Sequence, residues 1–337
     1  MVKSSKGYVL GVETTAHTFG VGVVCDGKVL SNFKDNYTTQ SGGMIPNKVA
    51  LHHRQVAQSV YDESIKISGI KESDIVAIAV SNAPGLAPSL LEGLKFTKVV
   101  AKRLGVPIIP VNHCVAHLEI GRLTGAADPV LLYASGANTQ IISYSEGKYR
   151  VFGETLDVGV GNFIDTFARH AGIGFPGGPV IDKLAQESDK VYVDLPYSIK
   201  GMDVSFSGLL TNLKNKFDSK KYDIRTLAYS LQETVFSMLV EASERALAHI
   251  GKKELLLGGG VGCNKRLQDM CKIMCDERGA KFYVPQNQFL VDNGGMIAYL
   301  GEIMYKSMVK KKMSFVDVDK LDINPRERTD QVEVFWK

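Results

Sequence analysis

The chain has 337 residues, a formal net charge of +4, and 45% hydrophobic and 23% charged residues, the composition of an ordinary globular protein. This length exceeds what one hydrophobic core usually serves, so two domains are expected. The apolar runs are too short and too often broken by charge to span a bilayer, and the small positive charge permits an anionic partner without requiring one.

The cysteines predict a reduced, cytosolic protein. Their number is odd, no C-x-x-C pair occurs, and the opening "MVKSSKGYVLGVETT" turns polar too early for a secretory signal. The five are Cys25, Cys114, Cys263, Cys271 and Cys275.

Two segments repeat one plan of strand, small polar turn and hairpin. "GYVLGVETT" reads as an apolar strand, and "FGVGVVCDGKVLSNF" as two strands around the turn pair Asp26-Gly27. In "PVLLYASGANTQIISYSEGKYRVFGET", a strand over Val130 to Ala134 precedes a hairpin through Glu146-Gly147. This repetition predicts an internal duplication.

The other segments alternate between helix and strand. Helices are expected from about Asn47 to Ser68, up to a C-cap glycine at Gly105, from Cys114, and from about Asp223 to Ile250. Strands are expected in "DIVAIAV", "VPIIPV" and "ELLLG", and a glycine-rich stretch lies between Gly153 and Ala185. The alternation predicts α/β layers with largely parallel pairing.

Three glycine turns follow predicted strands, at residues 11–15, 135–139 and 258–264. Turns of this kind form nests of backbone N–H groups that bind phosphate. None matches G-x-x-x-x-G-K-[ST], so a P-loop is excluded. Glycine also ends strands for steric reasons, but three such turns favour a nucleotide held between two lobes.

The segment "VNHCVAHLEIGR" puts His113 and His117 one helical turn apart, on one face. A metal site needs a further ligand, and Asp292 before the glycine turn of "LVDNGGMIAYLG" is a candidate. The alternatives are buried or surface histidines without a metal, and a simple helix N-cap role for Asp292. Cys114 points off the shared face of the histidines.

Two carboxylates and two basic clusters remain open. Asp165 in "GNFIDTFAR" and Asp182 after "FPGGPV" suit either ribose hydroxyls or a helix surface. The basic clusters suit a solvated helix face or a phosphate-backbone footprint, and no RNA-binding module is present. Their members are Lys95, Lys98, Lys102, Arg103, Lys214, Lys216, Lys220, Lys221 and Arg225.

These motifs in combination resemble the universal tRNA threonylcarbamoyladenosine synthases in their archaeal and eukaryotic form, the catalytic subunit of the KEOPS complex. The resemblance runs from about Tyr8 to the end. It rests on "GVETTAHTFGVGVV", "NHCVAHLEIGR", "LLYASGANTQ", "GETLDVGVGNFIDTFAR", "GFPGGP", "SFSGLL", "LGGGVGCNKRL" and "VDNGGMIAY", and "RTDQVEVFW" resembles the archaeal branch.

The resemblance implies the two-lobed fold of the actin-like ATPase superfamily, with duplicated ribonuclease-H-like domains and a cleft between them. We expect an N-terminal lobe over residues 1–128, a C-terminal lobe over 129–300, and a tail over 301–337 that packs back on the first lobe.

The resemblance also implies site residues. One iron or zinc would lie on His113, His117 and Asp292, which would carry catalysis, with Tyr133 as a possible fourth ligand. Substrate and nucleotide contacts would come from Tyr133, Ala134, Ser135, Gly136, Ala137, Asp165, Gly178, Asp182 and Asn264. Among these, Asp165 and Asp182 would contact the ribose and Asn264 the adenine.

The implied reaction moves a threonylcarbamoyl group from threonylcarbamoyl-AMP to the exocyclic amine of the adenosine 3′ of the anticodon, in tRNAs that read A-starting codons. AMP leaves. The implied partners are tRNA and the KEOPS subunits, namely a small atypical kinase, a dimerising subunit and a regulatory subunit. The implied location is the cytoplasm, without a membrane.

The chain departs from the family pattern at Ala137, where glycine is usual, and at Asp182, where Glu is commoner. We expect Ala137 to have a negative φ, and the shorter Asp182 weakens the case for direct ribose contact. Two alternatives stand beside the transferase. A nucleotide-binding scaffold that regulates a partner kinase is the stronger, whereas a metalloprotease lacks the usual Glu after His113.

Overall fold

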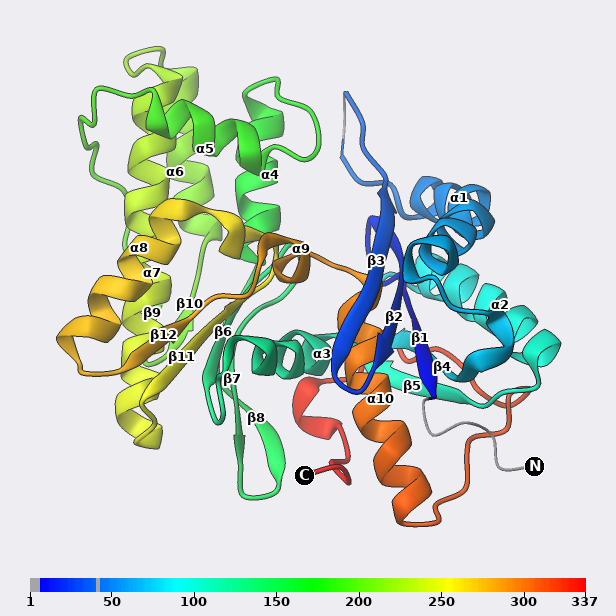
Figure 1. The fold of residues 1–337 in the computed structure, drawn as a ribbon. Helices are drawn as coiled ribbons and strands as arrows, with labels where there is room; N and C mark the ends of the chain where they lie inside the picture. The colour runs from blue at the N-terminus through cyan, green and yellow to red at the C-terminus, as the bar shows by residue number, and fades with distance from the viewer. Residues whose placement is uncertain (1–6, 41–42) are drawn as a thin grey trace.

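The computed structural model describes residues 7–40 and 43–337, which form two lobes side by side, each built on a five-stranded sheet (Figure 1). The first sheet has the order β3-β2-β1-β4-β5. Its strands are β1 (Tyr8–Glu13), β2 (Thr18–Cys25), β3 (Lys28–Asn36), β4 (Ile75–Ala83) and β5 (Ile108–Asn112).

The second sheet repeats the first. Its order, β8-β7-β6-β11-β12, matches strand for strand, and each sheet has two antiparallel pairs followed by two parallel pairs. This confirms the predicted duplication. The strands are β6 (Val130–Ala134), β7 (Thr139–Ser145), β8 (Lys148–Glu154), β11 (Glu254–Gly258) and β12 (Lys281–Tyr283).

The prediction of largely parallel pairing is wrong for half of the strand pairs, because two of the four pairs in each sheet are antiparallel. The two hairpins fill one side of each sheet, and a tight hairpin joins only antiparallel strands. Both hairpin turns have positive φ at their two central residues, as their sequences predict: Asp26 and Gly27 at 49° and 72°, Glu146 and Gly147 at 52° and 80°.

Helices cover both faces of the first sheet. On one face lie α1 (Pro46–Ser68) and α2 (Ala87–Leu104), and on the other lies α10 (Gly294–Lys310). Between the lobes lies α3 (His113–Glu119) (Figure 1). Because α10 packs on β1, β2 and β4, we group it with the first lobe.

The second lobe is more helical, and its largest core cluster gathers around α7. Its helices are α4 (Val160–His170), α5 (Gly178–Gln186), α6 (Ser207–Asp218), α7 (Ile224–Ile250) and α8 (Lys265–Glu277). Shorter elements are β9 (Ile199–Lys200), β10 (Asp203–Val204), α9 (Asn287–Leu290) and the 3₁₀ turns η1 (Glu72–Asp74), η2 (Ile120–Thr124), η3 (Gly260–Cys263) and η4 (Thr329–Gln331).

The first glycine turn serves packing. A Cβ on Gly11 would lie 2.2 Å from the backbone nitrogen of Ala298, and one on Gly294 would lie 2.4 Å from that of Gly22. Glycines on both sides therefore let α10 sit directly on β1 and β2. Gly11 is therefore required for steric reasons, as the alternative to a phosphate-binding turn proposed.

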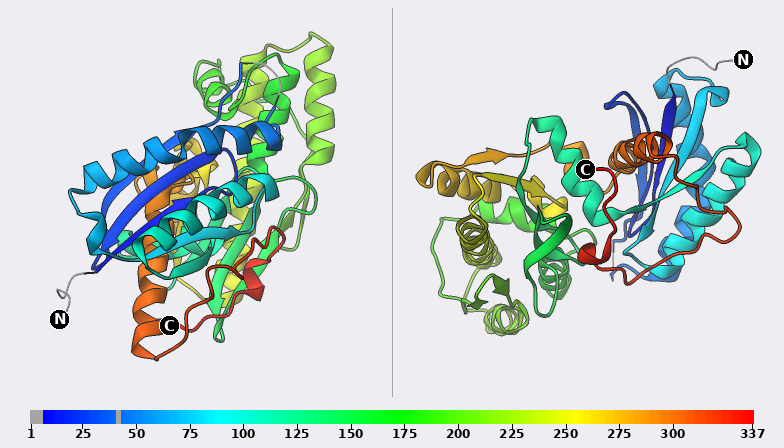
Figure 2. Two further views of the ribbon diagram at one scale, coloured as in Figure 1. Left: turned by 90° about the vertical axis from the view of Figure 1, so that its right-hand side faces the viewer. Right: turned by 90° about the horizontal axis from the view of Figure 1, so that it is seen from below.

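The tail after α10 runs along the first lobe and then reaches the second (Figure 2). The Asn324 amide donates to the Asn82 carbonyl at 2.8 Å, and the Asn112 side chain donates to Glu327 at 2.8 Å. Arg328 then pairs with Glu154 of β8 at 3.1 Å. Among the described residues, no helix has both the length and the apolar character needed to cross a membrane.

Candidate metal and nucleotide site

The histidine pair lies on α3, directly after β5. The Asn112 side chain caps this helix by accepting hydrogen bonds from the amides of Cys114 at 3.0 Å and Val115 at 3.2 Å. The helix therefore begins at His113, and His117 follows one turn later on the same face. Both histidines are almost fully buried, at 4% and 1% exposure.

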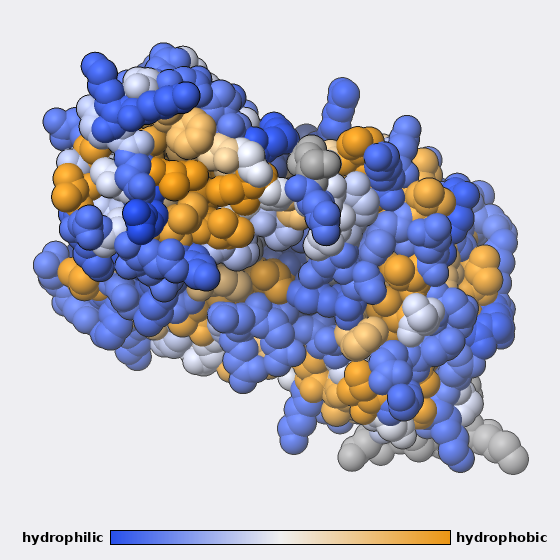
Figure 3. All heavy atoms as spheres, turned by 90° about the horizontal axis from the view of Figure 1, so that it is seen from above, coloured by the Kyte–Doolittle hydropathy of each residue, from blue (hydrophilic) through white to orange (hydrophobic). Residues whose placement is uncertain are grey.

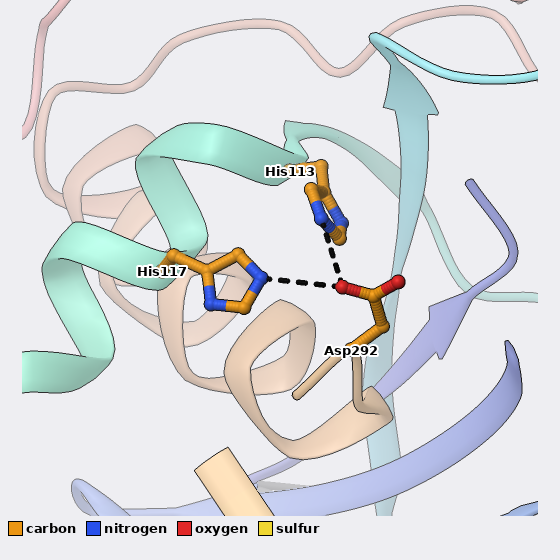
Figure 4. A group of neighbouring side chains, drawn as sticks. All are labelled: His113, His117 and Asp292. Carbon is orange, nitrogen blue, oxygen red and sulfur yellow. Dashed lines mark hydrogen bonds and ion pairs between the residues drawn. The ribbon is translucent and has the colours of Figure 1, made fainter. Parts of the chain in front are cut away.

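Asp292 approaches the histidines from the segment between α9 and α10 (Figure 4). Its Oδ1 lies 3.3 Å from Nε2 of His113 and 3.4 Å from Nε2 of His117. Ligand atoms about 2.0–2.2 Å from a tetrahedral metal stand about 3.3–3.6 Å apart. Both histidine–carboxylate separations match this spacing, and the three ligand atoms all lie within 4.8 Å of one another. Two imidazoles and one carboxylate suit a divalent ion such as iron or zinc.

The N-cap alternative for Asp292 is wrong. The cap of α10 is Asn293, whose side-chain oxygen accepts from the Met296 amide at 2.9 Å. The Asp292 carboxylate is therefore free of the helix and faces the histidines.

Tyr133, near the end of β6 in the second lobe, lies beside His113 and His117. Its hydroxyl lies 3.0 Å from Nε2 of His113, and its ring centroid lies 4.9 Å from that of His117. Burial raises the pKa of the Tyr133 hydroxyl, so the phenol stays protonated.

The charges within this group are interdependent. Burial opposes a charge on His113, but the carboxylates of Glu13 and Asp292, with Tyr133, raise its pKa well above the usual value. Burial lowers the pKa of His117. Although burial alone would raise the pKa of Asp292, charged His113 holds it well below its usual range. Without a metal, a proton on His113 balances the carboxylates.

The turn after β6 exposes Gly136 and Ala137, and backbone hydrogen bonds hold it in place. The Ser135 amide donates to the Asn138 carbonyl at 3.1 Å, and the Gly161 amide of α4 donates to the Ser135 carbonyl at 3.0 Å. A Cβ on Gly259 would lie 2.3 Å from the Ala134 carbonyl, so the third glycine turn packs against this one. Ala137 is not at positive φ, which confirms that expectation.

Two further pairs of the expected site residues are in contact. Asp165 accepts hydrogen bonds from the amides of Gly177 at 2.8 Å and Gly178 at 3.2 Å, and burial raises its pKa. Asp182 accepts from Asn264 at 3.0 Å and from Gln232 at 3.2 Å. Ribose and adenine contacts by these residues stay a prediction.

The comparison with known families decides what kind of protein this is. Residues 28–299 match the family model described as TsaD, tRNA N6-adenosine threonylcarbamoyltransferase. The chain belongs to this family.

Curated relatives agree with the family model. The tRNA N6-adenosine threonylcarbamoyltransferase of Thermococcus kodakarensis is 49% identical over 327 residues, which cover 97% of this chain and 99% of the relative. A probable bifunctional tRNA threonylcarbamoyladenosine biosynthesis protein of Methanosarcina mazei is 48% identical over 335 residues. That match covers 98% of this chain and 60% of the longer relative.

Solved structures of low identity share the fold alone. The HypF protein of T. kodakarensis superposes with a TM-score of 0.61 at 13% identity, over 92% of this chain and 48% of that chain. The activator of 2-hydroxyisocaproyl-CoA dehydratase from Clostridium difficile, solved with bound ADPNP, gives 0.53 at 10% identity, over 92% and 99% of the two chains. The two-lobed actin-like fold is thereby confirmed.

Sequence reasoning missed three side chains at the site. Glu13 and Thr15 lie behind His113, and Lys34 of β3 donates to the Asp292 carbonyl at 3.2 Å. Glu13 and Thr15 stand in the motif "GVETT", directly after the apolar strand. A polar pair at that point is the signal that could have drawn attention to them.

Proposed function

We propose that this chain transfers the threonylcarbamoyl group of threonylcarbamoyl-AMP to the exocyclic amine of the adenosine 3′ of the anticodon, in tRNAs that read A-starting codons. AMP is the leaving product. The observation that carries the proposal is the convergence of His113, His117 and Asp292 next to the strand that leads into the Ser135 turn, in a member of this family.

The metal site would consist of His113, His117 and Asp292, with Tyr133 as a neighbouring fourth donor. When bound, iron or zinc supplies a Lewis acid that polarises an oxygen of the acyl group. The chain's own part is to orient the acyl group against the tRNA amine. Both histidines are almost fully buried, which would limit the access of water to the site and so favour transfer over hydrolysis.

The nucleotide half of the substrate would lie along the second lobe. The turn over residues 133–137, of which Gly136 and Ala137 are exposed, would face the phosphate or acyl part, and Gly178 would border the ribose. Asp165 uses one oxygen on two amides, which leaves the other for a ribose hydroxyl. Asp182 would contact the ribose and Asn264 the adenine, in place of part of the hydrogen bonding between the two side chains. Support for this placement comes from the family resemblance and from the grouping of these residues.

The opening between the lobes is visible as a hollow on one face of the molecule (Figure 3). We place tRNA as the second substrate at this opening. The KEOPS subunits, namely the small atypical kinase, the dimerising subunit and the regulatory subunit, would be the protein partners, and the cytoplasm the location. The longer bifunctional relatives are consistent with a second protein working beside this one.

A reconstituted assay tests the proposal. Labelled threonine, bicarbonate, ATP, tRNA and an enzyme that makes the acyl-adenylate are combined with this protein and its complex partners, and label in tRNA is counted. We expect Asp292→Ala to abolish transfer. The matched control is Asp276→Ala, which removes an exposed carboxylate of α8 whose ion-pair partner among the described residues is Lys272, and which should leave transfer unchanged. Full transfer by Asp292→Ala would favour the scaffold alternative.

A further inference from the structure

Glu13, the last residue of β1, is a fully buried carboxylate that touches a candidate metal ligand. Its side chain has 0% exposure, and Oε2 lies 2.9 Å from Nδ1 of His113. Its other oxygen, Oε1, accepts from the Thr15 amide at 2.7 Å and from the Thr15 hydroxyl at 2.6 Å. A buried carboxylate is costly to hold unless such bonds satisfy it.

These bonds determine which nitrogen of His113 carries a proton. An ionised carboxylate only accepts hydrogen bonds, so Nδ1 must be the donor. The Thr15 oxygen lies 3.2 Å from the same nitrogen and, because its proton goes to Glu13, it also accepts there. Two acceptors therefore face Nδ1, and when the ring is neutral its lone pair lies on Nε2, toward Asp292.

His117 lacks this support. Its Nδ1 is buried and has no hydrogen-bond partner among the described residues. The two histidines of the site thus differ: a carboxylate holds the Nδ1 side of the His113 ring, whereas packing alone holds the Nδ1 side of the His117 ring. Packing alone restrains a ring less than a charged hydrogen bond does, so the site depends mainly on His113 for its geometry.

We infer that Glu13 is the positioning residue of the histidine–aspartate site. It orients His113, fixes its Nδ1–H tautomer, and adds a second negative charge near the divalent cation. Outer partners of metal-bound histidines typically contribute 10- to 100-fold in metal affinity. This inference rests on the proposed metal site, and its test separates the failure of one from the failure of the other.

The test measures zinc affinity of the purified, metal-stripped protein by competition with a chromophoric chelator. Glu13→Ala should weaken binding by about 10- to 100-fold. Glu13→Gln should weaken it less, because one amide oxygen still accepts from Nδ1. The matched control is Glu119→Gln. Glu119 is also 0% exposed, but its partners are Tyr149 at 2.6 Å, Arg122 at 2.7 Å and Lys337 at 3.1 Å, and it does not touch the site, so its loss should leave zinc affinity unchanged.

A second readout reports the tautomer directly. In the zinc-loaded protein with ¹⁵N-labelled histidine, the Nδ1 proton of His113 should exchange slowly with solvent, and Glu13→Ala should remove that signal. Glu13→Gln covers the case in which Glu13→Ala does not fold. Zinc affinity within twofold of the unmodified protein in Glu13→Ala, with the Nδ1 proton still protected, would overturn the role of Glu13 alone. No stoichiometric zinc in the unmodified protein would overturn the metal site as well.

Discussion

At the residue scale, Lys34 places an amine next to the proposed metal site. It is half-buried, it donates to the Asp292 carbonyl at 3.2 Å, and no carboxylate of the described residues lies within ion-pair distance of it. Burial lowers the pKa of its amine. A cation so placed favours an anionic substrate group.

Lys34→Met tests this role. Because the acyl-adenylate carries both a phosphate and a carboxylate, we expect its KM to rise about 10-fold, with a smaller change in kcat. Steady-state transfer at varied acyl-adenylate concentration measures both. The control is Lys28→Met, an exposed lysine on the same strand. An unchanged KM in Lys34→Met would contradict the role.

His53 predicts a pH dependence of stability. Burial, and then its neighbour His52, lower the pKa of His53 to about 4, whereas the unfolded value is 6.5. Between these values the unfolded chain binds the proton and the folded protein does not, so stability falls as the pH falls from about 6.5 to 4. From pH 7 to pH 5 the loss amounts to about 2 kcal/mol.

Urea unfolding of the unmodified protein and of His53→Gln at both pH values measures this loss. The glutamine amide retains a donor for the Ala16 carbonyl, which His53 contacts at 2.9 Å, but does not titrate. The variant should therefore lose about 2 kcal/mol less than the unmodified protein between the two pH values. Equal losses would show that His53 does not contribute.

The site was predicted unevenly from sequence. Helical spacing alone put His113 and His117 on one face, and the family resemblance added Asp292 and Tyr133. Glu13 was not predicted because its partner, His113, is 100 residues away in the sequence. No local sequence pattern indicates that a buried carboxylate contacts a distant histidine ring. Asp292 was ambiguous for a similar reason, since only the structure shows that Asn293 caps the helix.

At the element scale, the close packing of α10 against the first sheet depends on glycine. Gly11→Ala would place a Cβ 2.2 Å from the Ala298 nitrogen and 2.4 Å from the Gly294 carbonyl, both backbone atoms that cannot turn aside. We expect a loss of about 3 kcal/mol or more in unfolding free energy, measured by urea unfolding. Gly208→Ala in α6 is the control, because its Cβ meets nothing within 4 Å and alanine favours helix. A loss below 1 kcal/mol in Gly11→Ala would contradict this packing.

Most elements were readable from local patterns. The two hairpins carry their own turn residues, and the long helix predicted from about Asp223 to Ile250 begins at Ile224, with Asp223 as its cap. The pairing of the sheets was misjudged because alternation of strands and helices was given more weight than the hairpins. The packing role of Gly11 depends on residues nearly 290 positions later, which no local pattern contains.

At the scale of the whole molecule, the tail fastens the two lobes together. The Phe335 carbonyl accepts from Ser307 of α10 at 3.0 Å, and the Trp336 ring lies 6.3 Å from that of Tyr149 on β8. Lys337 reaches the buried Glu119 of α3 at 3.1 Å. These three residues contact both lobes, so their loss should loosen the relation between the lobes.

Trp336→Ala should lower the unfolding free energy by about 2 kcal/mol and speed hydrogen exchange in β8 and α10. The control is Phe315→Ala, which removes a ring stacked on Tyr305 within the first lobe, at 5.8 Å. That variant should leave exchange in β8 unchanged. Equal exchange in β8 for both variants would contradict a fastening role for the tail.

The central claim is that His113, His117 and Asp292 of this transferase form one metal site, and anomalous scattering from a crystal tests it most directly. Data collected at the iron and zinc edges should show one peak among Nε2 of His113, Nε2 of His117 and Oδ1 of Asp292, about 2.0–2.2 Å from each. A crystal grown with either metal whose anomalous map has no peak there, or has its strongest peak elsewhere, would contradict the account.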